Sequence, residues 1–189
     1  MAERNPEDKQ RRLLEAALTE FAATGLRGTR VEAIAARAGC SSGLIYTYFG
    51  SKEALFDAVL DAITARVTTD TPMTGDDLPG YAARLFDDTM NHPDVVRFAI
   101  WHQLERGGAR AAATDDAVAA KIAAVQAAQD EELVPPGLDP AIIVLAVQAI
   151  ARMWVTEPEP VIAAVDPAAR ADYRRRAVQD VVSALLRPR

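Results

Sequence analysis

Residues 29–52 read TRVEAIAARAGCSSGLIYTYFGSK, and this stretch decides the fold. Apolar residues from Val31 to Ala38 follow the i, i+3, i+4, i+7 spacing of one helix face. The Gly-Cys-Ser that follows, at residues 39–41, predicts a short turn, because glycine takes the left-handed conformation that ends a helix. A second short helix is predicted at residues 42–49. Two helices joined by a glycine-containing turn of this length predict a helix-turn-helix.

The second short helix has an unusual surface for a helix in solvent. Ile45 and Phe49, four residues apart, are predicted to face back onto the preceding helices. Tyrosine, serine and threonine hydroxyls can bond phosphate oxygens, and a leucine can contact a thymine methyl group, so this surface predicts contact with DNA. The positive charge of Lys52 would add to it at the start of the next helix. The residues predicted to lie nearer the outside are Ser42, Gly43, Leu44, Tyr46, Thr47 and Tyr48.

The flanking sequence extends the helical pattern in both directions. A first helix is predicted from Pro6, capped by Asn5, to Gly25, and the pattern Thr29-Arg-Val-Glu predicts a capping box for the second helix. Ser51 is predicted to cap a fourth helix that runs through about Thr68, and a loop rich in Pro and Gly follows it. Five more helices are predicted near residues 79–91, 93–106, 114–133, 140–156 and 167–187, the last two with Asp139 and Asp166 as N-caps.

Composition supports an all-α chain of about nine helices. Half of the 189 residues are hydrophobic and only 6% are aromatic, so alanine and aliphatic residues dominate. Alanine and leucine favour helix, and no alternating apolar run requires a strand. The predicted organisation is a helix-turn-helix DNA-binding domain at residues 1–50 and a larger ligand-binding and dimerisation domain at residues 51–189.

The net charge of −6 is unevenly distributed. Residues 1–60 carry eight basic and eight acidic side chains, whereas the rest carries 13 basic and 19 acidic ones. A neutral segment can still bind DNA if its basic residues face one way, and an acidic remainder would be repelled by the phosphates. This asymmetry favours DNA contact through the N-terminal segment.

Residues 12–60, RLLEAALTEFAATGLRGTRVEAIAARAGCSSGLIYTYFGSKEALFDAVL, resemble the DNA-binding domain of the tetracycline-repressor (TetR) family. The resemblance implies a three-helix head on a larger helical body, a dimer formed by the last two helices, and a body pocket whose ligand releases DNA. By position it implies a base contact for Leu44 and phosphate contacts for Tyr46, Tyr48 and Lys52. Thr29 and Arg30 would begin the helix across the DNA backbone, and Ser41, Ser42, Gly43 and Thr47 complete the candidate DNA-binding set.

Three positions depart from the family pattern. Ser42 and Thr47 stand where longer or basic residues are common, and Cys40 stands where valine is usual. The first two leave few long hydrogen-bond donors on the second short helix. Cys40 is interpreted as a small apolar residue in the turn.

The predicted body offers a dimer interface and a candidate ligand pocket. The helix at residues 140–156 is apolar on nearly every side and needs cover all round, part of which a partner subunit could supply. Together with the last helix from each subunit it would make a four-helix interface. Candidate ligand-binding residues are Phe86, Met90, Phe98, Trp101, His102, Met153 and Trp154, although aromatic and methionine side chains at helical spacing are equally consistent with plain core.

Other chemistry is not indicated. His92 and His102 are ten residues apart with no cysteine nearby, which is not metal-ligand spacing. No phosphate-binding glycine loop or catalytic motif is present, so no enzyme activity and no cofactor are predicted. The longest apolar stretch, residues 141–151, is too short to cross a bilayer, and Cys40 is the only cysteine, which fits the reducing cytoplasm.

The sequence therefore predicts a homodimeric repressor that a small, largely apolar ligand releases from a palindromic operator. One alternative is a DNA-binding regulator that is controlled by a protein partner or that has no ligand. Another is an enzyme or scaffold that shares the helical head.

Overall fold

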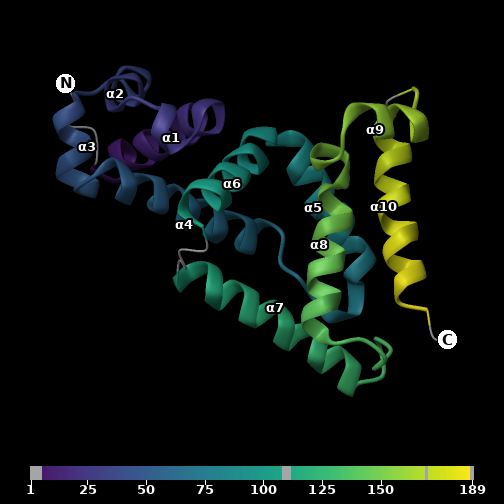
Figure 1. The fold of residues 1–189 in the computed structure, drawn as a ribbon. Helices are drawn as coiled ribbons and strands as arrows, with labels where there is room; N and C mark the ends of the chain where they lie inside the picture. The colour runs from purple at the N-terminus through teal and green to yellow at the C-terminus, as the bar shows by residue number, and fades with distance from the viewer. Residues whose placement is uncertain (1–5, 108–111, 169, 188–189) are drawn as a thin grey trace. The chain divides into compact units, whose positions relative to one another are not determined.

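The computed structural model describes residues 6–107, 112–168 and 170–187. Over these residues the chain is all-α, with ten α-helices, one 3-10 turn and no strand (Figure 1). The helices are α1 (Pro6–Gly28), α2 (Val31–Ala38), α3 (Ser42–Phe49), α4 (Lys52–Asp70), α5 (Leu78–Asn91), α6 (Pro93–Arg106), α7 (Ala112–Asp130), α8 (Pro140–Thr156), α9 (Glu159–Val165) and α10 (Ala171–Leu185), and the 3-10 turn η1 is Gly75–Asp77.

Most predicted boundaries are confirmed. The Ser51 hydroxyl accepts a hydrogen bond from the Ala54 N–H at 3.0 Å, and the Asp139 carboxylate accepts one from the Ala141 N–H at 2.7 Å, as N-caps do. The capping box at Thr29 was wrong, because Arg30 is the N-cap of α2 and no side chain caps this end. Asn5, predicted to cap α1, lies outside the described residues.

The segment between α8 and the last helix differs from the prediction. No helix is predicted between residues 156 and 167, yet the structure has a short helix there, α9. Pro160 occupies its first turn, where a missing N–H has no cost. Ile162 of α9 is buried and anchors it. Asp166 was predicted to cap the last helix, but it follows α9 as its C-cap, and α10 begins only at Ala171.

The chain forms two compact units. The head unit comprises Met1–Arg66 and Asp94–Thr114, and the body unit comprises Val67–Pro93 and Asp115–Arg189. Helix α6 thus belongs almost wholly to the head unit, although it lies in the second half of the chain. The functional division at residue 50 concerns which segment binds DNA, and it stays a prediction.

The head unit is built on an aromatic core from three helices. Phe21 of α1 meets Phe56 of α4 edge-on, with ring centroids 4.8 Å apart. Phe98 of α6 packs against Phe56 at the same distance, and all three rings are buried. Such pairs add about 0.5–1.5 kcal/mol each beyond the apolar area they bury. This core holds α1 and α4 in place, and α2 and α3 pack on it through Ile34 and Ile45.

The body unit is a helical bundle centred on α5, which packs against α8 and α10. Leu85 and Phe86 of α5 and Val147 of α8 are buried in its core. Helix α7 joins through Val125 and Ala128. Ile162 of α9 belongs to the same core, so five helices share it, and the layout is typical of helix bundles.

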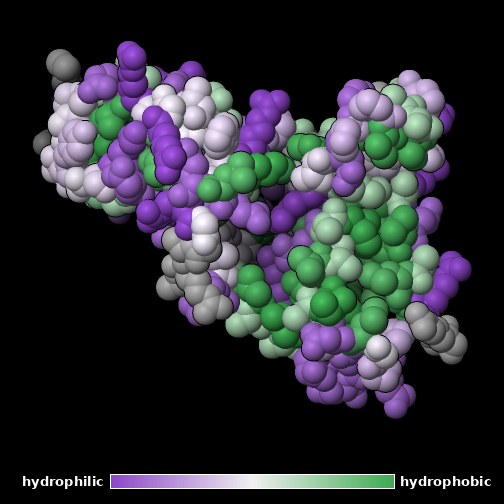
Figure 2. All heavy atoms as spheres, in the orientation of Figure 1, coloured by the Kyte–Doolittle hydropathy of each residue, from purple (hydrophilic) through white to green (hydrophobic). Residues whose placement is uncertain are grey.

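Helices α8 and α10 carry an exposed apolar surface on the body unit. Hydrophobic residues gather over these two helices in Figure 2. Ile142 and Leu145 of α8 are exposed, and so are Tyr173 and Val181 of α10. Among the described residues no single helix is long and apolar enough to cross a membrane, and only the bent pair α8 and α9, at 101°, passes on length and composition.

Candidate nucleic-acid interface

The turn between α2 and α3 has the predicted geometry. Gly39 adopts the left-handed conformation with φ 66° and ψ 42°. The N–H of Cys40 donates to the Ala35 carbonyl at 3.0 Å, which closes the end of α2. Arg12 of α1 donates to the Ala38 carbonyl at 2.6 Å, so α1 is tied directly to the turn. These bonds set the direction in which α3 leaves α2.

Helix α3 divides into a buried and an exposed side. Ile45 is 0% exposed, whereas the neighbouring Tyr46 is 52% exposed. Gly43 and Thr47 are exposed with Tyr46, and the Thr47 hydroxyl donates to the Gly43 carbonyl within the helix at 3.0 Å. The exposed side is uncharged, because α3 reads SGLIYTYF.

The buried side of α3 is wider than the sequence predicted. Leu44 and Tyr48, expected near the outside, are partly buried and pack against the head core with Phe49. Because α3 is short and packs on a small core, these two side chains are only partly open to solvent. Leu44 also borders a small recess with Arg12 and Cys40.

Thr29 and Lys52 are connected through the protein itself. The Lys52 ammonium donates to the Thr29 carbonyl at 3.1 Å, which fixes the start of α4 beside the start of α2. The Thr29 side chain is buried, and its hydroxyl donates to the Gly25 carbonyl at 2.7 Å. Arg30 is exposed. Ser41 is exposed and Ser42 partly buried, at the N-terminal end of α3.

Several basic residues of the head are paired with acidic ones. Arg11 lies 2.6 Å from Asp8 and 2.7 Å from Glu15, and Arg37 lies 2.6 Å from Glu20. Exposed pairs of this kind contribute little to stability. Arg30 and Lys52 are among the head cations for which the described residues show no acidic partner.

Three of the predicted ligand-binding residues lie in the head unit. Phe98 belongs to the aromatic core, and Trp101 packs against Gly25. His102 stacks on Phe56 with ring centroids 5.3 Å apart, and its Nε2 lies 3.3 Å from Asp57. Each of these side chains is engaged in packing within the head.

The other four predicted ligand-binding residues lie in the body unit. Phe86 and Trp154 are buried in its core, Met153 packs against that core, and Met90 is exposed. Arg174 of α10 lies over the Trp154 ring, 5.1 Å from its centroid. The seven residues thus divide between two units, and their membership of one pocket stays a prediction.

Metal-binding groups are not clustered in the described part of the chain, where no set of three His, Cys, Asp or Glu side chains converges. His92 lies 3.1 Å from Asp88, and Cys40 is a free, partly buried thiol packed on the head core.

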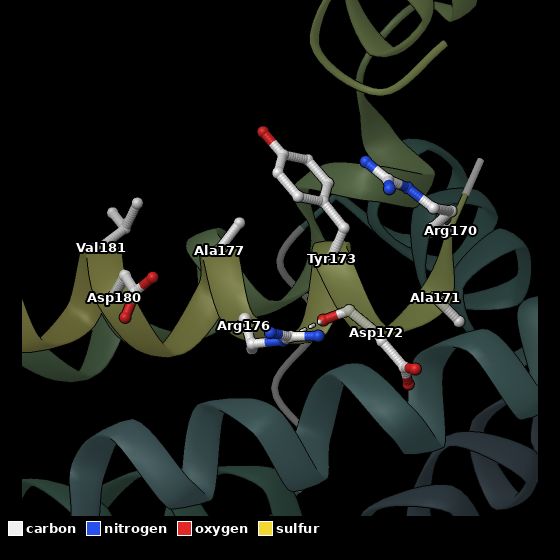
Figure 3. A pocket seen from close by; sticks show the side chains of 8 residues that line it. All are labelled: Arg170, Ala171, Asp172, Tyr173, Arg176, Ala177, Asp180 and Val181. Carbon is white, nitrogen blue, oxygen red and sulfur yellow. Dashed lines mark hydrogen bonds between the residues drawn. The ribbon is translucent and has the colours of Figure 1, made fainter. Parts of the chain in front are cut away.

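A shallow recess follows the exposed side of α10 (Figure 3). Tyr173, Ala177 and Val181 point the same way along the helix, one turn apart. Charged side chains flank this apolar stripe, among them Arg176 and Asp180. The lining residues come from α10 and its N-cap, Arg170, so the recess is an uncovered helix face.

Sequence reasoning missed two groups of polar residues. Glu105 of α6 accepts hydrogen bonds from the backbone of α1, and only the tertiary fold brings them together. Tyr81 of α5 is buried and Arg152 of α8 partly buried in the body unit, where α8 was predicted to be apolar on nearly every side. An arginine four residues after Gln148 in an otherwise apolar helix was the available signal.

Comparisons with known proteins agree over both units. The family described as bacterial regulatory proteins, tetR family, matches residues 13–59, and the tetracyclin repressor-like C-terminal domain matches residues 77–183. The HTH-type transcriptional repressor SCO4008 of Streptomyces coelicolor is 33% identical over 162 residues, which are 84% of each chain.

Solved structures share the whole fold. A transcriptional regulator of Streptomyces coelicolor, SCO4942, superimposes with a TM-score of 0.85 at 34% identity, over 95% of this chain and 99% of that one. FadR of Bacillus subtilis, in complex with stearoyl-CoA, has a TM-score of 0.66 at 17% identity, over 91% of this chain and 96% of its own. With its helix-turn-helix head and its matching C-terminal domain, the chain belongs to the TetR family of DNA-binding transcriptional regulators.

Proposed function

We propose that this chain acts as a homodimeric repressor that binds a palindromic operator and is released by a small ligand. The observation that carries the proposal is the division of α3, with Ile45 fully buried and Tyr46 beside it half exposed. An uncharged helix that keeps an aromatic hydroxyl in solvent suits the major groove, where α3 of each subunit would read one half-site.

Different residues would position the protein on the DNA and read the bases. Tyr46, Lys52 and Arg30 would bond phosphates, because hydroxyl and cationic donors contact the backbone independently of sequence. Leu44 and Thr47 would touch base edges through methyl groups, and the small Gly43 allows close approach. The partly buried Tyr48 would add a hydroxyl contact to a phosphate. The proposed set also includes Ser41, Ser42 and Thr29. They lie at helix starts, where backbone N–H groups can bind a phosphate.

Dimerisation through α8 and α10 is supported by their exposed apolar surface. Leu145 is 66% exposed and Ile142 52%, on the side of α8 that faces away from α5. The stripe of α10 seen in Figure 3 is bordered by both signs of charge, with Arg176 and Asp180 one turn apart. In a two-fold interface the same surface meets itself, so alternating charges can pair across an apolar centre.

The ligand site is proposed to lie in the body unit and to accept a molecule whose bulk is apolar. The walls of this site would be two aromatic side chains and a flexible one from the same core, Phe86, Trp154 and Met153. FadR of Bacillus subtilis, which shares the fold, is described with stearoyl-CoA, a molecule with a long apolar chain. The ligand would release DNA only if it binds the DNA-free arrangement of the dimer more tightly than the DNA-bound one. Such a regulator works where the DNA is, in the cytoplasm.

The test is selection of bound genomic fragments by the purified protein, followed by release assays on the enriched sequence. We expect a palindrome with half-sites about one helical turn apart. Enrichment of no palindrome would contradict the proposed mode of binding. Failure of every stabilising small molecule to release the operator would favour control by a protein partner instead.

A further inference from the structure

Polar side chains from three helices lie beside the apolar core of the body unit. Tyr81 belongs to α5, Lys121 to α7, and Gln148 and Arg152 to α8. Gln148 and Arg152 are one turn apart, and the Arg152 guanidinium donates to the Gln148 side-chain oxygen at 3.3 Å. Lys121 shares a face of α7 with the buried Val125, four residues later. We call these four residues the cationic cluster.

Tyr81 gives the first sign that the cationic cluster is incomplete. Its side chain is 0% exposed, and its hydroxyl has no hydrogen-bond partner among the described residues. Buried hydroxyl groups are almost always bonded, so an unbonded one marks a place where a partner is missing. Burial raises the pKa of Tyr81, while Arg152 and Arg84 nearby act to lower it. The hydroxyl is therefore neutral and available as a donor.

The two cations give a second, independent sign. Arg152 and Lys121 are partly buried, and no carboxylate among the described residues lies within 4 Å of either. Burial lowers the pKa of Lys121, and the charge of Arg152 lowers it further. Burial also lowers the pKa of Arg152, although Tyr81 and Asp88 oppose this. The Asp88 carboxylate itself lies 3.1 Å from His92.

Two neighbouring cations and an unbonded hydroxyl form a donor set that lacks its acceptor. Partly desolvated charges are retained in proteins when they are paired or bind an ion. We propose that the effector of this regulator carries an anionic head group, a carboxylate or a phosphate, bound by Arg152 and Lys121 with Tyr81 as an added donor. The forked guanidinium of Arg152 suits either group, since it can give two parallel hydrogen bonds. The apolar core around Phe86 and Val147 would take the rest of the molecule.

This inference rests on the proposed function, in that it names the chemistry of its ligand. The test uses four probes with the same chain and different heads: octanoate, octyl phosphate, octanol and octylamine. Thermal shift and titration calorimetry measure their binding to the full-length protein without DNA. We expect octanoate or octyl phosphate to bind at least about tenfold more tightly than octanol, and octylamine not to bind. The difference between octanoate and octyl phosphate identifies the head group.

Variants locate the site. Arg152→Met and Lys121→Met should each weaken binding of the anion by about tenfold or more, while Arg152→Lys keeps part of it. Arg97→Met, on an exposed position of α6 in the head unit, is the matched control and should bind as the wild type does. Tyr81→Phe should weaken binding without loss of stability, because the hydroxyl has no protein partner to lose. This variant keeps the test valid if an Arg152 variant folds poorly.

The results separate the two proposals. Equal binding of octanol, binding unchanged in Arg152→Met, or no binding of either anion would overturn the anionic site. Anion binding that is lost in Arg152→Met but does not release the operator would support the site and contradict ligand release. Operator release by octanol with Arg152→Met unaffected would support ligand release and overturn the anionic site.

Discussion

The carboxylate of Glu105, on α6, accepts hydrogen bonds from the backbone N–H groups of Leu26 and Arg27, on α1, the second at 3.2 Å. Both N–H groups lie just after Gly25, where α1 departs from helical geometry with φ 69° and ψ −177°. The break frees backbone donors at the end of α1, and an acidic side chain 78 and 79 residues away in sequence accepts hydrogen bonds from two of them. Helix α6 therefore completes the structure of the head.

Glu105→Ala should destabilise the head unit by about 1–3 kcal/mol, because it leaves two backbone donors without an acceptor. Glu105→Gln keeps one acceptor oxygen and should lose less. Urea unfolding followed by circular dichroism measures the change. Gln103→Ala, exposed on the same helix, is the control. Equal stability of Glu105→Ala and Gln103→Ala would show that the carboxylate contributes nothing to the head.

Gly25→Ala should cost about 1–3 kcal/mol, because its backbone conformation is almost restricted to glycine. The added Cβ would also lie 2.7 Å from a ring carbon of Trp101, so the ring would have to move. Gly43→Ala is the control, because it is expected to change the stability in the opposite direction. Gly43 lies in α3 with nothing within 4 Å of an added Cβ, and alanine should stabilise that helix by about 0.5–1 kcal/mol. A Gly25→Ala protein as stable as the wild type would mean that the kink is not required.

Tyr46→Phe and Lys52→Ala should weaken binding to all DNA sequences alike, because phosphate contacts carry no base information. Lys52→Ala should also reduce the slope of log affinity against log salt by about one. Leu44→Ala should change base preference instead. Fluorescence anisotropy on the selected operator and on random DNA distinguishes the two effects, with the exposed Arg187→Ala as control. Unchanged affinity in both Tyr46→Phe and Lys52→Ala would contradict the assigned interface.

Leu145→Glu and Val181→Glu should produce monomers, since each places a charge in the proposed apolar interface of α8 and α10. Leu104→Glu tests whether any exposed leucine has this effect. Leu104 is 70% exposed, on α6 of the head unit, and its substitution should leave the dimer intact. Sedimentation velocity gives the oligomeric state. Monomers should bind a palindrome far more weakly, because two half-sites are no longer read together. Dimers in both body variants would place the interface elsewhere.

Acid should weaken the body unit through Asp166, which is buried between α9 and α10 and bonded to Arg174 at 2.7 Å. Burial acts to raise the pKa of this carboxyl, but the bond from Arg174 opposes it, and the net result is a pKa below the ordinary 3.8. A lowered carboxyl pKa stabilises the fold above pH 3.8, and this contribution is lost as the pH falls through the lower, folded value.

Asp166→Asn should therefore be less stable than the wild type at neutral pH and should lose less stability on acidification. Denaturant unfolding at a series of pH values measures both. Asp61→Asn, exposed on α4, should follow the wild-type curve. An Asp166→Asn curve parallel to the wild type would rule out this carboxyl as a source of acid sensitivity.

The sequence by itself determined the local structure of the head and the class of the protein. The helix spacing at residues 31–38, the glycine at 39 and the caps at Ser51 and Asp139 act over a few residues, so their outcome is fixed by short-range sterics and hydrogen bonding. Where local signals were ambiguous the prediction failed, as at Thr29, whose hydroxyl bonds Gly25 instead of capping α2.

Only the tertiary structure decided which distant residues meet. It placed Phe98, Trp101 and His102 in the head core rather than with Phe86 and Trp154, brought Glu105 to the break in α1, and turned Leu44 and Tyr48 partly inward. It also revealed the buried, unbonded Tyr81 hydroxyl near Arg152 in the body. Burial and pairing of polar groups depend on contacts between helices far apart in the chain, and helical periodicity carries no information about which helices pack together.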